Sequence, residues 1–115
     1  MPCFRDKPLK ERINTVHSIF KRYPDRIPIC VNKSLNIQIA DIDKEKFLVP
    51  RDLTVGQFLY VIRNRIKLQP AQALYIFFND ELVNTSMTVA EVYKQYKNKE
   101  DEMLYAIYST ENTFG

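Results

Sequence analysis

The chain contains 115 residues, a length that fits one domain. Hydrophobic residues make up 45% of it and charged residues 27%, which supports a packed core and excludes a wholly disordered chain. No apolar run approaches the roughly 20 residues that cross a bilayer, and no signal-peptide pattern is present, so we expect a soluble, cytoplasmic protein.

The counts of individual residue types exclude most site chemistry. The chain has one histidine, His17, and two cysteines, Cys3 and Cys30. Structural zinc sites need about four Cys or His ligands at short spacings, so we expect no metal. Gly56 and Gly115 are the two glycines. Phosphate-binding loops need several glycines close together, so we expect no nucleotide cofactor either.

The net charge of +3 is concentrated near the N-terminus. Residues 1–26 carry seven basic and three acidic side chains, whereas the remaining residues carry ten basic and eleven acidic ones. Such a segment can contact an acidic protein, an anionic membrane or nucleic acid, although a solvated helix face explains it more simply. No nucleic-acid-binding motif accompanies the charge, so we expect no nucleic-acid partner.

The first predicted element is a helix with one buried face. Pro8 suits its first turn, and Pro24 ends it because the residue before a proline avoids helical angles. Ile19 lies at the edge of the apolar stripe, so the core accounts for it only in part. The stripe consists of Leu9, Ile13, Val16, Phe20 and Tyr23.

Two strands follow. The β-branched run 27–31 predicts the first, in which Pro28 must open the strand or face an unpaired side because it has no N–H to donate. The run 46–49 predicts the second strand, which Pro50 stops.

Two capping boxes then mark helix starts. In each box, a threonine hydroxyl and a longer polar side chain three residues later satisfy free backbone amides at the helix start. The two pairs are Thr54 with Gln57 and Thr88 with Glu91. Apolar residues at helical spacing follow both boxes. A nearly continuous apolar run at 73–78 and a final run at 103–108 predict two buried strands.

The order of elements predicts an α+β fold. Two strands, a crossover helix and two further strands correspond to a ubiquitin-like β-grasp, with a four-stranded mixed sheet. We assign residues 1–25 to an N-terminal helical extension, 26–108 to the β-grasp domain and 109–115 to a flexible C-terminal tail.

Binding is better supported than catalysis. Cys30 lies in an apolar strand, where a buried thiol is the usual state, so a Cys30–His17 hydrolase has little support. In the second strand, Leu48 must face away from Phe47 and Val49. One of these two sets must therefore be covered by the N-terminal helix or by a partner. An edge strand flanked by lysines can accept an extended acidic peptide by strand addition.

The polar C-terminal segment has two interpretations. A disordered terminus is the simpler one. Alternatively, Gly115 serves acyl transfer, because a carboxylate with no neighbouring Cβ can thread a narrow active site and be activated as an adenylate and then a thioester.

Four stretches carry a family resemblance: KRYPDRIPICV, DIDKEKFLVPRDLTVGQF, VIRNRIKL and YSTENTFG. They resemble the autophagy ubiquitin-like modifiers, a family that includes microtubule-associated protein light chain 3 and the GABA-receptor-associated protein. The resemblance extends from about Leu9 to Gly115.

The resemblance implies a modifier and not an enzyme. Family members are conjugated to phosphatidylethanolamine on autophagosomal membranes by an activating and a conjugating enzyme. A cysteine protease exposes the terminal glycine and later removes the lipid. By this match Gly115 is the lipid-conjugation residue, and the membrane partner is reached through the covalent phosphatidylethanolamine.

The resemblance also implies a groove with two pockets for cargo receptors, whose acidic motifs carry an aromatic residue and, three positions on, an aliphatic one. By match, the aromatic pocket consists of Ile19, Pro28, Lys46, Leu48 and Met103. The aliphatic pocket consists of Phe47, Val49, Pro50, Leu53, Phe58 and Val61. The basic contacts to the acidic motif residues are Arg26, Lys44 and Arg65.

The chain departs from the family pattern at three places. Thr15 replaces a usual acid, Met103 replaces a usual phenylalanine, and Asn84-Thr85 replaces two frequent prolines, so peptide preferences are expected to shift. The alternative function is a non-conjugated adaptor in vesicle or microtubule-associated trafficking, which would not depend on Gly115.

Overall fold

The computed structural model describes residues 3–35 and 39–111. These residues form one short 3₁₀ helix, three α-helices and five strands. In chain order the elements are η1 (Phe4–Asp6), α1 (Leu9–Arg22), β1 (Arg26–Lys33), β2 (Lys46–Pro50), α2 (Val55–Ile66), β3 (Tyr75–Phe78), β4 (Glu81–Leu82), α3 (Val89–Tyr96) and β5 (Leu104–Ser109).

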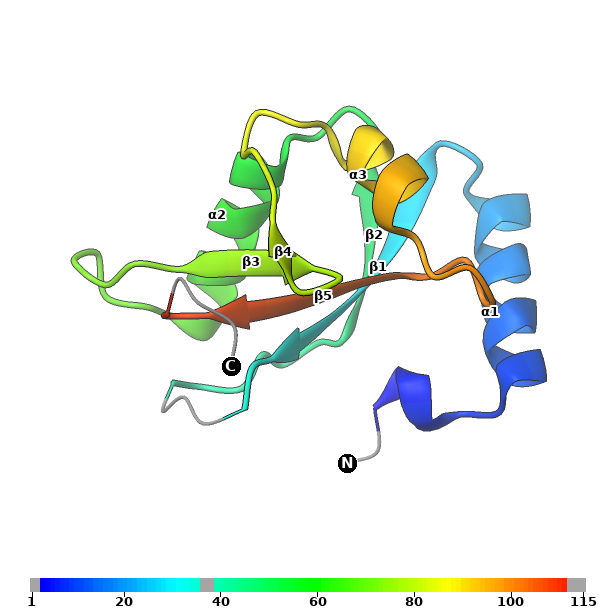
Figure 1. Ribbon diagram of the computed structural model, residues 1–115, viewed down its shortest axis with the longest axis horizontal. Coiled ribbons are helices and arrows are strands. Elements are labelled where there is room, and N and C mark those ends of the chain that lie inside the picture. Colours follow the sequence, from blue (N-terminus) through cyan, green and yellow to red (C-terminus); the bar gives the residue numbers. More distant parts are fainter. Residues whose placement is uncertain (1–2, 36–38, 112–115) are drawn as a thin grey trace.

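The strands form one mixed sheet in the order β2-β1-β5-β3-β4 (Figure 1). β1 and β5 are parallel neighbours at its centre, and the other pairs are antiparallel. Five successive residues of β1 are buried, as expected of a central strand that is covered on both faces. Figure 1 shows α2 and α1 on opposite sides of the sheet.

The sheet has five strands, where the sequence predicted four. The additional strand is β4, which pairs with β3 after a turn at Asn79 and Asp80 with φ of 51° and 63°. Two successive residues at positive φ are typical of a type I′ turn, whose twist suits a hairpin. β4 has only two residues, so it carries no alternation that the sequence could reveal. The mixed sheet and the ubiquitin-like arrangement are otherwise as predicted.

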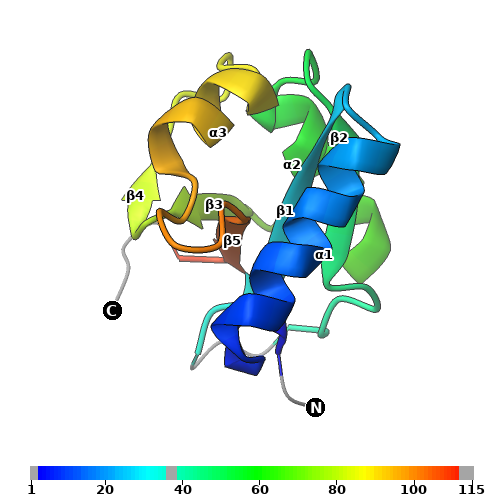
Figure 2. The same ribbon diagram turned by 90° about the vertical axis from the view of Figure 1, so that its right-hand side faces the viewer.

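Two hydrophobic clusters occupy the two faces of the sheet. The larger one joins α2 and α3 to Ile27, Ile29 and Val31 of β1. The smaller one lies under the N-terminal segment and consists of Phe4, Val16, Cys30 and Met103. Figure 2 looks onto α1, which crosses in front of β1. The N-terminal extension is therefore a second layer that packs on the sheet.

Pro28 lies inside β1 without breaking the sheet. The backbone N–H of Val31 donates to the carbonyl of Glu45 at 2.8 Å, so alternate residues of β1 face β2, and the nitrogen of Pro28 points the other way. Pairing with β5 begins only at Ile29. The proline nitrogen thus lies where no ladder partner is required, as the sequence predicted.

Both capping boxes form as predicted. The Thr54 hydroxyl accepts from the Gln57 N–H, and the Gln57 side chain accepts from the Thr54 N–H. Thr88 and Glu91 make the same pair of bonds at the start of α3. An antiparallel bridge between Thr54 and Thr88 joins the two helix starts.

Several strand boundaries differ by one or two residues from the sequence prediction. β1 spans Arg26–Lys33 instead of 27–31, and β3 begins at Tyr75 instead of residue 73. β2 includes Pro50 as its last residue, and β5 extends through Ser109, the first residue that the sequence analysis assigned to the tail. Ser109 is 4% exposed and pairs with Tyr75 of β3, which explains why the strand continues to this position.

Candidate functional site

β2 presents two different faces, as its sequence predicted. Phe47 and Val49 are 5% and 4% exposed and belong to the main core. Leu48 is 37% exposed, and Lys46 is exposed as well. Successive side chains of a strand point to opposite faces, so Leu48 and Lys46 share the face that α1 partly covers.

β2 is also an edge strand of the sheet. Val31 of β1 is hydrogen-bonded to Glu45, the residue just before β2, so by alternation the backbone groups of Phe47 and Val49 also point toward β1. The backbone groups of Lys46 and Leu48 therefore point outward from the sheet. An extended peptide can pair with these groups, and the missing N–H of Pro50 limits the ladder at that end.

The structure brings the five residues of the expected aromatic pocket into one region. Pro28 of β1 and Leu48 of β2 are directly opposite each other, and so are Cys30 and Lys46. Met103 packs with Cys30 and with Val16 of α1, and Ile19 lies one helical turn after Val16. Within this set Pro28 and Met103 are buried, Ile19 is half-buried, and Lys46 and Leu48 are exposed.

The six residues of the expected aliphatic pocket divide by exposure. Phe58 is 1% exposed and packs edge-to-face on Phe47, with the ring centroids 5.6 Å apart. Val61 is 39% exposed, and Pro50 and Leu53 are half-buried. The three accessible side chains are thus Pro50, Leu53 and Val61, while Phe47, Val49 and Phe58 lie in the core beneath them.

The basic residues lie at both ends of β2. At the start of the strand, the Lys44 ammonium and the Arg65 guanidinium lie 5.1 Å and 5.3 Å from the centroid of the Phe47 ring. Arg65 also pairs with the exposed Asp43 at 3.0 Å. Arg26 is exposed and pairs in register with Pro50, at the other end. The edge is therefore flanked by positive charge, which favours an acidic ligand.

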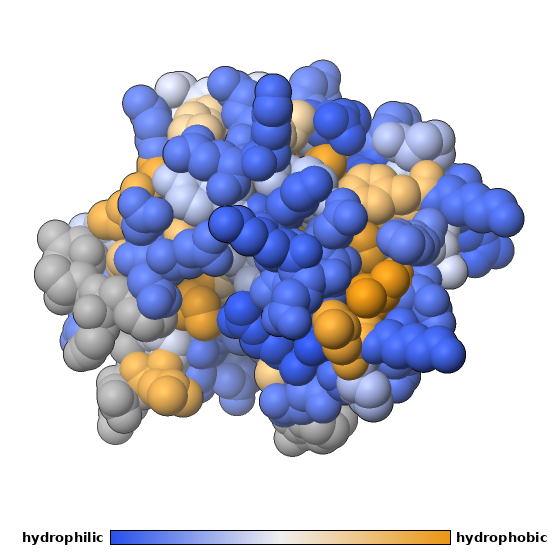
Figure 3. Space-filling view, turned by 45° about the vertical axis from the view of Figure 1, so that its right-hand side comes forward, coloured by the Kyte–Doolittle hydropathy of each residue, from blue (hydrophilic) through white to orange (hydrophobic). Residues whose placement is uncertain are grey.

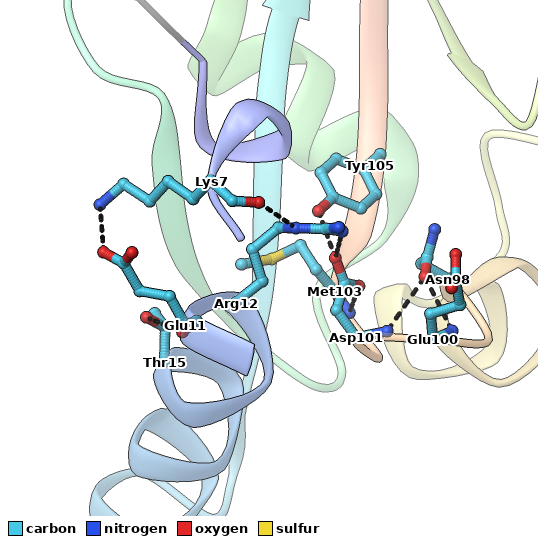
Figure 4. Close-up of polar contacts among 9 residues, drawn as sticks. All are labelled: Lys7, Glu11, Arg12, Thr15, Asn98, Glu100, Asp101, Met103 and Tyr105. Atoms are coloured by element: carbon cyan, nitrogen blue, oxygen red, sulfur yellow. Dashed lines mark hydrogen bonds and ion pairs between the residues drawn. The ribbon is translucent and has the colours of Figure 1, made fainter. Parts of the chain in front are cut away.

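A buried carboxylate holds α1 against the last strand (Figure 4). The Asp101 side chain is fully buried and accepts hydrogen bonds from Arg12 of α1 at 2.6 Å and from the Tyr105 hydroxyl at 2.5 Å. Its second oxygen accepts from the backbone N–H of Met103 at 2.8 Å. This network, which the sequence analysis missed, fixes both the helix and Met103, a residue of the expected aromatic pocket. Burial raises the pKa of Tyr105, which keeps its hydroxyl protonated as a donor.

Phe4 is a second feature that the sequence analysis missed. It is 1% exposed, packs with Met103, Val16 and Cys30, and its ring centroid lies 5.2 Å from the Lys46 ammonium. Phe4 precedes the periodic stripe of α1, and its partners are distant in sequence. An isolated aromatic residue before a helix gives no pattern that predicts burial.

α1 keeps part of its apolar surface accessible. Leu9 is 36% exposed, and Ile13 and Ile19 are half-buried. A space-filling view shows mostly hydrophilic side chains, with a narrow apolar strip toward the right (Figure 3). The half-buried state of Ile19 agrees with its place at the edge of the apolar stripe.

The described residues offer little for catalysis. Cys30 is fully buried, and burial raises the pKa of its thiol strongly, which suppresses the nucleophilic thiolate. His17 is exposed on α1. Residues 3–35 and 39–111 contain no group of three or more His, Cys, Asp or Glu side chains that could hold a metal ion. None of the helices in these ranges combines the length and apolar character of a membrane span. Gly115 lies outside the described residues.

Comparisons with known proteins identify the family of this chain. Residues 11–115 match the family model described as autophagy protein Atg8, ubiquitin-like. Autophagy-related protein 8d of Arabidopsis thaliana is 46% identical over 110 residues, which cover 96% of this chain and 91% of that protein. Autophagy-related protein 8 of Candida albicans is 48% identical over 113 residues, which cover 97% of this chain and 83% of that protein.

A solved structure shows the same fold. The crystal structure of Trypanosoma brucei ATG8 superposes with a TM-score of 0.87 at 39% identity, covering 97% of this chain and 96% of that chain. A match over nearly the whole chain, in both sequence and structure, establishes the family. This chain belongs to the Atg8 family of ubiquitin-like autophagy proteins.

Proposed function

We propose that the chain is a ubiquitin-like modifier conjugated through Gly115 to phosphatidylethanolamine on autophagosomal membranes. There it recruits cargo receptors and adaptors through a groove along β2, with its aromatic pocket beside α1 and its aliphatic pocket beside α2. In this role it is a substrate of the activating and conjugating enzymes and of the cysteine protease that processes and delipidates it, and it is not itself an enzyme.

One observation supports the recruiting role above others. β2 is an edge strand with an outward backbone at Lys46 and Leu48, and basic side chains flank it at both ends. An acidic peptide in extended form can add a strand here. Its aromatic side chain would rest against Ile19, Pro28, Lys46 and Leu48, and its aliphatic side chain against Pro50, Leu53 and Val61. Arg26, Lys44 and Arg65 would attract its acidic residues.

The conjugation role rests on family membership and on Gly115. Its test is the intact mass of the membrane-bound protein from cells, with and without a phospholipase that cleaves the headgroup linkage. We expect a phosphatidylethanolamine-sized addition that the phospholipase reduces, and we expect Gly115→Ala to abolish it while the fold stays intact. A membrane fraction of unmodified mass would favour the trafficking adaptor, which the basic N-terminal segment supports.

A further inference from the structure

The N-terminal segment Cys3–Asp6 packs against two residues of the proposed aromatic pocket. The Phe4 side chain lies in one cluster with Met103, and the Lys46 ammonium lies 5.2 Å from the centroid of its ring. Met103 is fully buried and Lys46 is exposed, so we assign Met103 to the base of the proposed pocket and Lys46 to its rim. Phe4 therefore lies beside both the base and the rim of the proposed pocket.

Several interactions hold Phe4 in this position. Its backbone N–H donates to both carboxylate oxygens of Glu45, at 2.9 and 3.1 Å, and Asn32 donates to the same carboxylate at 3.1 Å. The next residue, Arg5, places its guanidinium 4.3 Å from the centroid of the Tyr105 ring. Phe4 is thus anchored by a charge-assisted hydrogen bond on one side and by a cation–π contact through its neighbour on the other.

The floor beneath the pocket is tightly filled. Val16, Cys30 and Met103 are fully buried, and Phe4 is 1% exposed. Ile19 and Leu48 are the apolar side chains that remain accessible above this floor. A peptide aromatic ring can rest on the accessible side chains. Because the buried residues leave no free volume beneath, a larger ring system would need the volume that Phe4 occupies.

We infer that Phe4 is a specificity-determining residue, which sets the size of the aromatic side chain that the groove accepts. This inference rests on the peptide-binding role proposed above. With Phe4 in place, the pocket is shallow and favours phenylalanine or tyrosine. Tryptophan, with its fused second ring, binds fully only when Phe4 is displaced. Displacement breaks the hydrogen bond between Phe4 and Glu45 and exposes the Phe4 ring, so tryptophan binds more weakly.

The test compares two acidic peptides that differ only in a phenylalanine or a tryptophan at the aromatic position. Calorimetry with the full chain gives Kd for each peptide, and the ratio of the two values is the readout. For Phe4→Ala we expect the Kd of the tryptophan peptide, divided by that of the phenylalanine peptide, to fall by about tenfold, which is the scale of a changed side-chain fit in a pocket. Phe4→Leu, which keeps an apolar anchor, should shift it less in the same direction.

Arg5→Ala is the matched control. It removes the cation–π contact with Tyr105 and loosens the same segment, but it keeps the Phe4 ring that occupies the volume beside the proposed pocket. We expect its Kd ratio to stay within about twofold of the parent. A thermal melt of each variant confirms that it is folded at the assay temperature, and Phe4→Leu serves as the test if Phe4→Ala does not fold.

The outcomes separate this inference from the proposed function. An unchanged ratio in folded Phe4→Ala or Phe4→Leu, with both peptides still bound, would overturn the role of Phe4 alone. An equal shift in Arg5→Ala would also overturn it, because loosening of the segment would then be the cause. If the parent chain binds neither peptide, the proposed recruiting function fails.

Discussion

Leu48 is the residue on which the proposed groove depends most directly. Its side chain is 37% exposed on a strand whose neighbours on either side, Phe47 and Val49, are buried. It lies opposite Pro28, so it has an apolar wall beside it and solvent above it. An exposed leucine in such a setting is a candidate for contact with a partner, because partial burial leaves apolar area to be covered.

We predict that Leu48→Ala weakens binding of an acidic peptide with an aromatic residue and, three positions on, an aliphatic one. The expected loss exceeds about 1 kcal/mol, or roughly fivefold in Kd, which is the scale of truncating a central side chain of an interface. Isothermal titration calorimetry measures it. Leu82→Ala is the matched control, because Leu82 is a 49% exposed leucine on β4, at the other edge of the sheet. Equal affinity for Leu48→Ala and the parent chain would place the peptide elsewhere.

Single residues also show where prediction from the sequence reaches its limit. The two-faced character of β2 was predictable because alternation is a local pattern. The burial of Phe4 and Asp101 was not, because each depends on partners that are distant in the chain. Asp101 stands in the charged run KNKEDE, which is typical of a solvated loop. Its burial is tolerable because Arg12, Tyr105 and the backbone N–H of Met103 all donate to its carboxylate.

Among the elements, α1 is joined to the last strand by a polar network centred on one buried carboxylate, in addition to its apolar packing on the sheet. Arg12 donates to the backbone carbonyl of Lys7 at 2.9 Å and to the buried Asp101 at 2.6 Å. The same carboxylate accepts from the backbone N–H of Met103, just before β5, and from the hydroxyl of Tyr105, which is a residue of β5. The helix, the strand and Met103, which we place at the base of the proposed aromatic pocket, are therefore coupled through one side chain.

We predict that Asp101→Asn lowers the free energy of unfolding by about 3 kcal/mol, because it leaves Arg12 without its buried counter-charge. Urea denaturation measures the change, and hydrogen exchange should show the largest loss of protection in α1. Glu102→Gln is the control, since the Lys97–Glu102 pair at 3.3 Å is solvent-exposed and should contribute less than about 1 kcal/mol. Similar losses for both variants would mean that the network does not anchor the helix.

The elements themselves were largely predictable. Periodic apolar residues, two capping boxes and the flanking prolines indicated α1, α2, α3 and the four longer strands, because each of these signals is local. β4 escaped prediction because two residues cannot display a period. The segment of η1 escaped because its burial comes from tertiary contacts and not from any periodicity of its own. For the site, the residues were placed by family resemblance, while their division into accessible and buried sets required the structure.

At the scale of the whole molecule, burial of tyrosines links stability to alkaline pH. Burial, and then the charge of Glu102, raise the pKa of Tyr93 to about 12. Burial also raises the pKa of Tyr105 and of Tyr108. In the unfolded chain a tyrosine titrates near pH 10, so above that pH the unfolded state loses protons before the folded state does.

We therefore predict that the contribution of these tyrosines to stability is fully present below about pH 10 and falls as the pH rises toward about 12. Urea denaturation at about pH 8, 10 and 11 measures the fall. Tyr93→Phe should make it shallower, whereas Tyr60→Phe, at a tyrosine that is 64% exposed, should follow the parent chain. A slope that is the same in all three proteins would exclude Tyr93 as a source of the effect.

The two edge strands of the sheet differ in length, and this difference determines how many peptide strands one molecule can add. β2 offers five residues along one edge, whereas the opposite edge ends in the two residues of β4. In the proposed role, one molecule therefore adds one peptide strand. Within residues 3–35 and 39–111, the chain has no second long edge through which copies could continue the sheet into a polymer. A cargo particle is then held by the number of molecules displayed on the membrane facing it, so the surface density of this protein, more than the strength of any single groove, determines the avidity of capture.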